Sequence, residues 1–182
     1  MAIIYGRAIG GGSVATMSLF GDGSNGDLIL PSTQTYSQPI SYTRSSIEEK
    51  QYKSISIDTG ATYAVSDLSK DLVWRVQGDC TINGTIDLSA TQPSQNGGNL
   101  SIFVGGDLTI NGSIRCNGAD ADGSTDADGG NGGSIYIVYN GAIHNNGEIT
   151  VNGGLPKGTG TAGAIGTVTI LSYNEYMQDQ TA

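Results

Sequence analysis

The stretch of this sequence with the clearest potential for chemistry is an acidic, glycine-containing segment between residues 119 and 134. Its four aspartates are candidate calcium ligands: Asp120, Asp122, Asp126 and Asp128. Ca²⁺ takes about six to eight oxygen ligands, and carboxylates that alternate with glycine bends can surround such an ion. The segment departs from an EF-hand loop, because its glycine comes too early and no glutamate closes the shell. It also lacks the Gly-Gly-x-Gly-x-Asp nonapeptide of calcium-loaded solenoids. The alternative to a calcium site is an acidic loop that is simply solvated.

Residue types that could support catalysis are few and scattered. His144 is the only histidine, and no serine and aspartate constellation accompanies it, so neither a triad nor a histidine-based metal site is predicted. Asp87, Asp107 and Glu148 are outward carboxylates in different columns, whereas a glycosidase needs a pair about 5–9.5 Å apart. Asp87 aligns with Arg115 in the next repeat, where a stacked ion pair is the simpler interpretation. We therefore expect that the protein is not an enzyme.

These residues are set in a repeated sequence. Three segments align without gaps, at residues 72–90, 100–118 and 135–153, and a shorter copy begins at Val168. The copies start 28, 35 and 33 residues apart (100 − 72, 135 − 100 and 168 − 135). Within each copy apolar residues alternate with polar ones, which is the pattern of half-buried strands. Residues 55–65 alternate in the same way and form an upstream half-copy.

The alignment places like residues in the same column of successive copies. The inward columns are Leu72/Leu100/Ile135, Trp74/Ile102/Ile137, Val76/Val104/Tyr139, Cys80/Leu108/Ile143, Ile86/Ile114/Ile149 and Leu88/Cys116/Val151. A further column, Ile82/Ile110/Asn145, ends in a polar residue that needs a hydrogen-bond partner or a cavity. The two cysteines fall in different inward columns, so free buried thiols are expected rather than a disulfide.

An Asn-Gly pair recurs in every copy, at Asn83, Asn111 and Asn146. Such a pair usually marks a hairpin, but a hairpin pairs its own strands and does not require near-identical neighbours. If each copy is one coil, identical positions stack at the strand spacing of about 4.8 Å, and the pair marks a corner, where Asn and Gly tolerate positive φ. We predict an all-β fold: a single-stranded parallel β-helix of about 4–5 coils with glycine-rich corner loops, preceded by an irregular N-terminal segment.

The repeat also divides the chain. We expect an N-terminal attachment segment at residues 1–47, a β-helix domain at residues 48–174 and a frayed C-terminal tail at residues 175–182. The coils emit polar, glycine-rich loops at one repeated corner: residues 91–99, 119–134 and 154–167. Loops that leave a solenoid at one corner form a single surface, and such a surface often binds a partner.

Two aromatic side chains, Phe103 and Tyr136, point outward in the alternation. They occupy non-equivalent positions, since Phe103 aligns with Val138. Outward apolar residues on a solenoid flank contact a neighbouring subunit more often than a sugar. We therefore predict a subunit contact formed by Phe103, Tyr136 and Val138, because small β-rich proteins often need association to bury enough surface.

The composition excludes several function classes. The 182 residues include 29 glycines, 17 acidic and 8 basic residues, and the net charge is −9. The basic residues are scattered, and phosphate backbones are bound by clustered Lys and Arg, so nucleic acid is not an expected partner. No apolar run approaches the roughly 18 residues of a membrane span. No signal peptide is visible at the N-terminus, so synthesis in a cytoplasm without export is expected.

Three strings of the sequence carry a resemblance to known proteins: Phe20-Gly-Asp-Gly-Ser-Asn-Gly-Asp27, Ile55-Ser-Ile-Asp-Thr-Gly-Ala-Thr-Tyr63 and Val76-Gln-Gly-Asp-Cys-Thr-Ile-Asn-Gly-Thr-Ile86. From about residue 20 to residue 172 the chain resembles the short β-helix proteins of tailed bacteriophage virions, which occur in tail fibres, head fibres and capsid decoration. The resemblance implies a trimeric virion part made in the host cytoplasm. Its N-terminal segment would attach to other virion proteins and its body would face outward. The aspartate-rich loop departs from the nearly pure glycine loops of that family, and no catalytic residue carries over.

On this basis we expect a virion structural protein with a mechanical or adhesive action, such as weak, multivalent contact with host surface glycans. A cytoskeletal or surface-adhesive β-helix that polymerises end to end is an alternative, which the long loops disfavour. An ice-binding solenoid needs aligned threonines, and the threonine columns break after two coils. A polysaccharide depolymerase is a further alternative.

Overall fold

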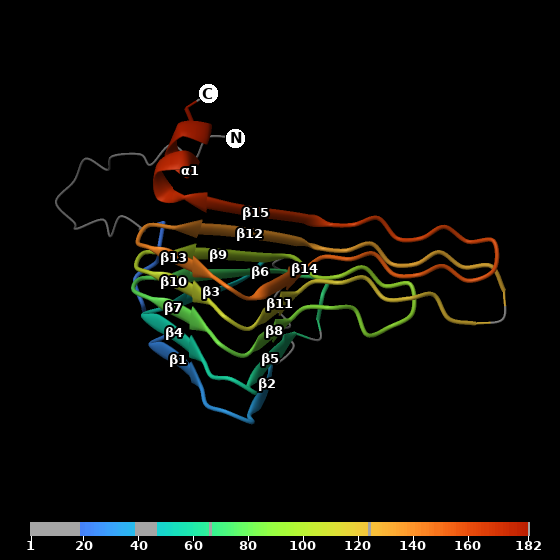
Figure 1. The fold of residues 1–182 in the computed structure, drawn as a ribbon, viewed down its shortest axis with the longest axis horizontal. Helices are drawn as coiled ribbons and strands as arrows, with labels where there is room; N and C mark the ends of the chain where they lie inside the picture. Colours follow the sequence, from blue (N-terminus) through green and yellow to red (C-terminus); the bar gives the residue numbers. More distant parts are fainter. Residues whose placement is uncertain (1–18, 39–46, 66, 124, 182) are drawn as a thin grey trace, which may run out of the picture.

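The computed structural model describes residues 19–38, 47–65, 67–123 and 125–181. In these residues the chain forms three β-sheets of five parallel strands each and one short helix. Successive strands visit the three sheets in turn, and each strand pairs with the strand three places further along the chain. The chain therefore winds as a parallel β-helix (Figure 1).

The strands of each sheet follow one another in chain order. The first sheet contains β1 (Asp27–Leu30), β4 (Ser54–Ile57), β7 (Cys80–Ile82), β10 (Leu108–Ile110) and β13 (Ile143–Asn145). The second contains β2 (Thr35–Gln38), β5 (Thr62–Val65), β8 (Thr85–Asp87), β11 (Ser113–Arg115) and β14 (Glu148–Thr150). The third contains β3 (Ile47–Tyr52), β6 (Asp71–Val76), β9 (Leu100–Val104), β12 (Ser134–Tyr139) and β15 (Thr167–Ser172).

The register of the sheets agrees with the columns predicted from the sequence. Leu108 lies between Cys80 and Ile143 in the first sheet, and its side chain is 0% exposed. In the third sheet Leu100 pairs with Leu72 on one side and with Ile135 on the other. Because the paired strands run parallel, the Asn-Gly pairs mark corners, and the hairpin interpretation is wrong. The backbone at these corners does not have a positive φ. Glycine is needed there for close approach instead, because a Cβ at Gly112 would collide with the carbonyl of Gly84.

Apolar side chains fill the space that the three sheets enclose. The largest is Trp74, which packs edge-on against Tyr63 and Tyr52 with ring centroids 4.8 and 5.8 Å away. Burial of these two tyrosines raises the pKa of Tyr63 and raises the pKa of Tyr52 to about 12. Cys80 and Cys116 are free and buried, as predicted, and desolvation raises the pKa of each thiol to about 12.

The prediction for the N-terminal segment is partly wrong. Strands β1 and β2 pair in parallel with β4 and β5, so residues 27–38 continue the β-helix instead of preceding it as irregular chain. The polar sequence Thr-Tyr-Ser-Gln of β2 conceals the strand, because it lacks a regular apolar alternation. Residues 1–18 and 39–46 of the predicted attachment segment lie outside the described residues.

The predicted frayed tail is also corrected, because residues 173–179 form helix α1 (Tyr173–Asp179). The helix begins with a capping box: the Ser172 hydroxyl accepts the backbone N–H of Glu175, and the Glu175 carboxylate accepts the backbone N–H of Ser172 at 2.7 Å. The helix packs against β12 and β15 of the third sheet. The string Ser-Tyr-Asn-Glu was the sequence signal for this helix.

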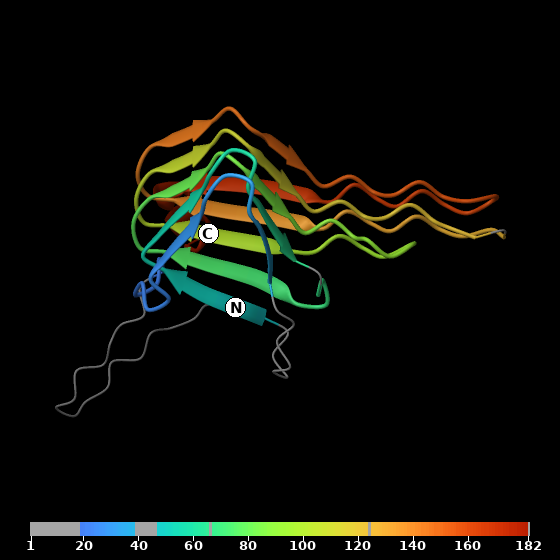
Figure 2. The same cartoon turned by 90° about the horizontal axis from the view of Figure 1, so that it is seen from below.

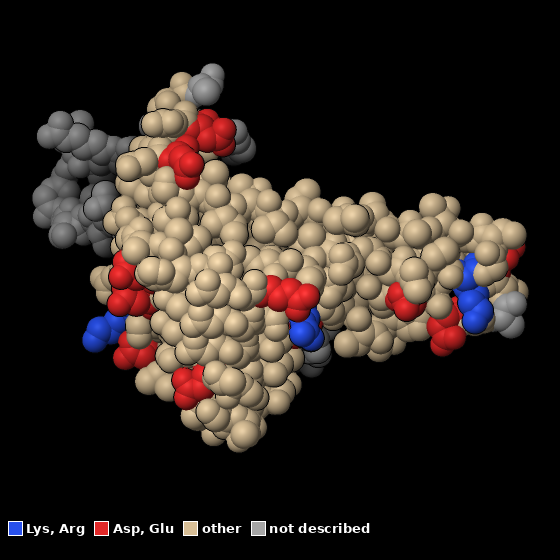
Figure 3. Space-filling view, viewed as in Figure 1, with Lys and Arg blue, Asp and Glu red and all other residues tan. Residues whose placement is uncertain are grey.

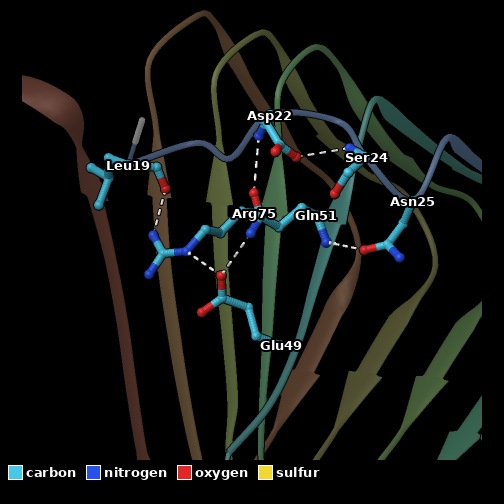
Figure 4. Close-up of polar contacts among 7 residues, drawn as sticks. All are labelled: Leu19, Asp22, Ser24, Asn25, Glu49, Gln51 and Arg75. Carbon is cyan, nitrogen blue, oxygen red and sulfur yellow. Dashed lines mark hydrogen bonds and ion pairs between the residues drawn. The ribbon is translucent and has the colours of Figure 1, made fainter. Parts of the chain in front are cut away.

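At the N-terminal end of the described chain, residues 19–26 form a strap across the outer side of β3 and β6 (Figure 4). Arg75 donates to the carbonyl of Leu19 at 2.6 Å and pairs with Glu49 at 3.1 Å. Gln51 accepts the N–H of Asp22 through its side chain, and its own N–H donates to the Asn25 side chain at 2.6 Å. These contacts fix the strap on the third sheet.

The surface carries charge in small separate groups on the face shown in Figure 3. Two ion pairs are present in the described part of the chain, Lys50 with Glu48 and Arg75 with Glu49. Within that part no helix has the length and apolar character needed to span a membrane.

Candidate functional site: the glycine-rich arm

Three long loops project from one corner of the β-helix and form an arm (Figures 1 and 2). The arm consists of residues 88–99, 116–133 and 151–166, of which residue 124 is not described. Each loop leaves the second sheet, runs outward, turns and returns to the third sheet. The second and third loops extend further than the first (Figure 1). These segments contain the predicted corner loops at residues 91–99, 119–134 and 154–167, except that Ser134 and Thr167 already belong to β12 and β15.

Backbone hydrogen bonds join the arm segments to one another in two directions. Successive loops are linked along the stack, for example from Gly132 N–H to the Ala164 carbonyl at 2.9 Å. The outgoing and returning halves are linked across the arm, for example from Gly163 N–H to the Gly154 carbonyl at 3.0 Å. The arm is therefore a hydrogen-bonded bundle rather than a set of independent loops.

Glycine allows the segments of the bundle to approach closely. Gly160, Gly163 and Gly166 recur at every third residue, the period of an extended chain of polyproline II type. A Cβ atom at Gly163 would collide with the carbonyl of Gly130 in the loop below, and one at Gly166 would collide with that of Gly133. Side chains at these positions would push the loops apart and break the hydrogen bonds between them.

Asparagine and aspartate side chains tie each loop to the next and form what we call the Asx ladder. Asn96 accepts the backbone N–H of Asn131, and Asn131 in turn accepts that of Ala164, each at 2.8 Å. Asn99 accepts the N–H of Ser134 at 2.9 Å in the same way. The ladder continues into the β-helix body, where Asp79 accepts from Asp107 and Asp107 accepts from Ala142.

The ladder accounts for three of the four predicted calcium ligands. Asp120 accepts the N–H of Leu155 at 2.7 Å, Asp126 that of Thr159 at 2.8 Å and Asp128 that of Thr161 at 2.7 Å. Hydrogen bonds from Thr159 lower the pKa of Asp126 below its ordinary value of 3.8. Among the described residues, Asp122 accepts a hydrogen bond from its neighbour alone, the N–H of Gly123. Among the described residues no three acidic, histidine or cysteine side chains are placed to hold a metal ion, so the calcium site stays a prediction without geometric support.

The predicted subunit contact lies on the outer face of the third sheet, where α1 packs. Phe103 and Tyr136 are neighbours, with ring centroids 6.2 Å apart, and Tyr176 of α1 lies 6.5 Å from Phe103. Arg75 covers the ring of Phe103 at 4.9 Å. Val138 is 0% exposed, so it has no surface left for another subunit in this conformation. The sequence did not reveal this packing because the helix was not predicted.

The remaining sequence candidates do not form a reactive site in the described residues. His144 is exposed in β13, and Asn145 beside it is also exposed, so this asparagine meets water. Asp87 and Arg115 are neighbours in register but form no ion pair there, since the Asp87 carboxylate accepts the N–H of Ser89 at 2.9 Å. The arm thus offers hydrogen-bonding groups rather than a nucleophile or an acid–base pair.

Comparison with known proteins finds no matching family model, no matching curated protein and no matching solved structure.

Proposed function

We propose that the chain is a structural protein of a tailed-bacteriophage virion, which displays a β-helix of about five coils on the particle surface and directs its arm outward. The observation that carries this proposal is the separation of the arm from the described chain ends. The strap begins at Leu19, and α1 ends two residues before the end of the described chain at Thr181. Both the strap and α1 lie on the outer side of the third sheet. The rings of Phe20 and Tyr173 join them at 5.5 Å.

The arm is attached at the other end of the same strands. Its loops return into the starts of β9, β12 and β15, whereas α1 follows the last residue of β15. Figure 1 shows α1 and the arm on opposite sides of the β-helix. A particle that holds the protein by its N-terminal segment would therefore present the arm to the surroundings.

The composition of the arm suits weak adhesion to host glycans. The tips of the loops expose hydroxyl, amide and carboxylate groups, among them Thr91, Ser94, Asp122 and Thr159. Such groups form hydrogen bonds with sugar hydroxyls, and repeated weak contacts on one particle gain strength through effective concentration. Because the bundle already orders the loops, binding would cost less conformational entropy than binding by free loops.

Mass spectrometry of purified virions of the encoding phage tests the virion assignment. We expect the protein in the particles at a stoichiometric copy number, with hundreds of copies for a shell decoration and a handful for a tail part. Its absence from particles that carry the known structural proteins would refute the assignment. Adhesion is tested by binding of the recombinant chain to host cells, with a Thr91→Ala/Thr159→Ala variant as the comparison. If the parent chain and the variant bind host cells equally well, these two threonines at the arm tips do not contribute to adhesion.

A further inference from the structure

The last layer of the stack, residues 140–171, differs from the layers beneath it in a way that points to a partner. We call its outer side the end face. In the layers below, Asx side chains accept selected N–H groups of the next layer, and backbone carbonyls accept many of the others. In the last layer four of these columns lose their carboxylate or amide: Asp107 is followed by Ala142, Asp120 by Leu155, Asp128 by Thr161 and Asn131 by Ala164. Only Asn146 and Asn152 keep an amide in these ladder columns.

The glycine columns of the arm change in the same layer. A Cβ at Gly129 would collide with the carbonyl of Gly154, and one at Gly132 with that of Val151, because the next loop packs against them. Gly166 lies over Gly133 and Gly163 over Gly130, a spacing of 33 residues. The same spacing places Ala162 over Gly129 and Ile165 over Gly132. The last layer therefore carries side chains where another loop of the same kind would need glycine.

These changes leave the end face apolar and nearly free of charge. Ile165 is 76% exposed, Leu155 66% and Val168 43%. Beside them lie the last inward residues of the first and second sheets, Ile143 and Ile149, which are only partly buried. The charged groups of the layer are Glu148 and Lys157, which cancel, and His144, although the whole chain carries −9. Exposed apolar surface of this kind marks an interaction site.

The opposite end of the β-helix, which the first layer of strands forms, carries charged side chains at inward positions of the third sheet. Glu48 and Lys50 occupy the inward positions beneath Leu72 and Trp74 and form an ion pair at 2.9 Å. A head-to-tail stack would place the apolar end face on this charged pair. The end face therefore suits neither a further coil nor a head-to-tail copy.

We propose that the end face is the dimer interface of this protein, in which two copies meet face to face about a two-fold axis. A two-fold interface brings the same surface of both copies together, so apolar residues meet apolar residues. The layer contributes 32 residues (171 − 140 + 1), and a standard interface uses about 20–30 residues on each side. The layer itself carries no net charge, and α1, with Glu175 and Asp179, stands beside it beyond the end of β15 (Figure 1).

The experiment is a molar-mass measurement on the full chain by light scattering and sedimentation across a concentration range. We expect a dimer of 37.4 kDa (2 × 18.7 kDa). Ile165→Asp should raise its dissociation constant by at least about 100-fold, because each dimer would then bury two unpaired carboxylates. Leu155→Asp is a second variant with the same expected direction. The matched control is Ile29→Asp in β1, whose side chain is 66% exposed at the other end, and it should leave the dimer unchanged.

Each other outcome overturns the proposal. A monomer at all concentrations would show that a different molecule covers the end face. A trimer that Ile165→Asp does not affect would favour the flank contact. Equal weakening by Ile29→Asp and Ile165→Asp, or filaments in electron micrographs, would indicate head-to-tail stacking. Circular dichroism of each variant checks that the fold is kept, which is expected because the substituted side chains are exposed.

Discussion

The β-helix body and the arm are stacked from the same layers but are held together by different forces. In the body each layer contributes apolar side chains to an enclosed core, such as Leu108 and Ile110 at 0% exposure. In the arm the space between segments is filled by backbone, and glycine and the Asx ladder replace side-chain packing. The difference teaches that one chain can continue a stack beyond its hydrophobic core by replacing apolar burial with hydrogen bonds.

The largest expected effect comes from removing a core side chain of the body. Leu108→Ala should lower the free energy of unfolding by about 2–5 kcal/mol, because it leaves a cavity between two layers. The matched control is Leu155→Ala in the arm, whose side chain is 66% exposed and which should change stability by less than about 0.5 kcal/mol. Urea denaturation at low protein concentration measures both. Similar losses in the two variants would contradict the division between body and arm.

A smaller effect should follow from adding a side chain to the arm bundle. Gly163→Val places a Cβ against the carbonyl of Gly130, and overpacking of this kind costs about 1–3 kcal/mol. We expect faster amide hydrogen exchange in residues 126–133 and 151–166, while exchange in β6 and β9 stays slow. Thr161→Val on the same segment is the control, because Thr161 is exposed. Simultaneous loss of protection in the body would mean that arm and body unfold as one unit.

The sequence predicted the body better than the arm or the ends, and the reason is physical. Apolar columns such as Cys80, Leu108 and Ile143 can be recognised in the sequence, because burial requires an apolar residue in every layer. The ladder residue Asn131 looks like any loop asparagine, since its partner is a backbone N–H 33 residues away. The glycines at 160, 163 and 166 were visible as composition, but their role depends on a neighbouring loop. Strand β2 and helix α1 were missed because both are polar.

A smaller effect is expected from two substitutions of Asp128, which distinguish a role as a hydrogen-bond acceptor in the Asx ladder from a role as a calcium ligand. In the ladder, Asp128→Asn keeps an oxygen that accepts the N–H of Thr161, whereas Asp128→Ala loses it. The alanine variant should therefore exchange faster at Thr161, with a loss of about 0.5–1.5 kcal/mol of local stability, and the asparagine variant should behave like the parent. A bound calcium ion would be lost in both variants. If added calcium raises the melting temperature of the parent chain but of neither variant, Asp128 is a calcium ligand.

The smallest expected effect is a pH dependence confined to the outer part of the arm. The pKa of Asp126 is lowered below 3.8 because its carboxylate accepts hydrogen bonds from Thr159. A carboxyl group with a lowered folded-state pKa stabilises the fold above its unfolded pKa, and this contribution is lost as the pH falls through the folded value. Amide exchange at Thr159, corrected for the intrinsic rate at each pH, should therefore be constant above about pH 4.5 and increase below pH 3.8.

Asp126→Asn should remove this dependence, because the amide oxygen still accepts the N–H and does not titrate in this range. Protection in the core strand β10 serves as the internal reference. Among the described residues, Cys80 is the one titratable neighbour in the column of Leu108, and the column of Ile110 has none. A parallel loss of protection in β10 would assign the transition to global acid unfolding. Protection at Thr159 that stays constant to pH 3 would show that the Asp126 hydrogen bond contributes nothing to the order of the arm, and the difference between arm and body would then rest on glycine packing alone.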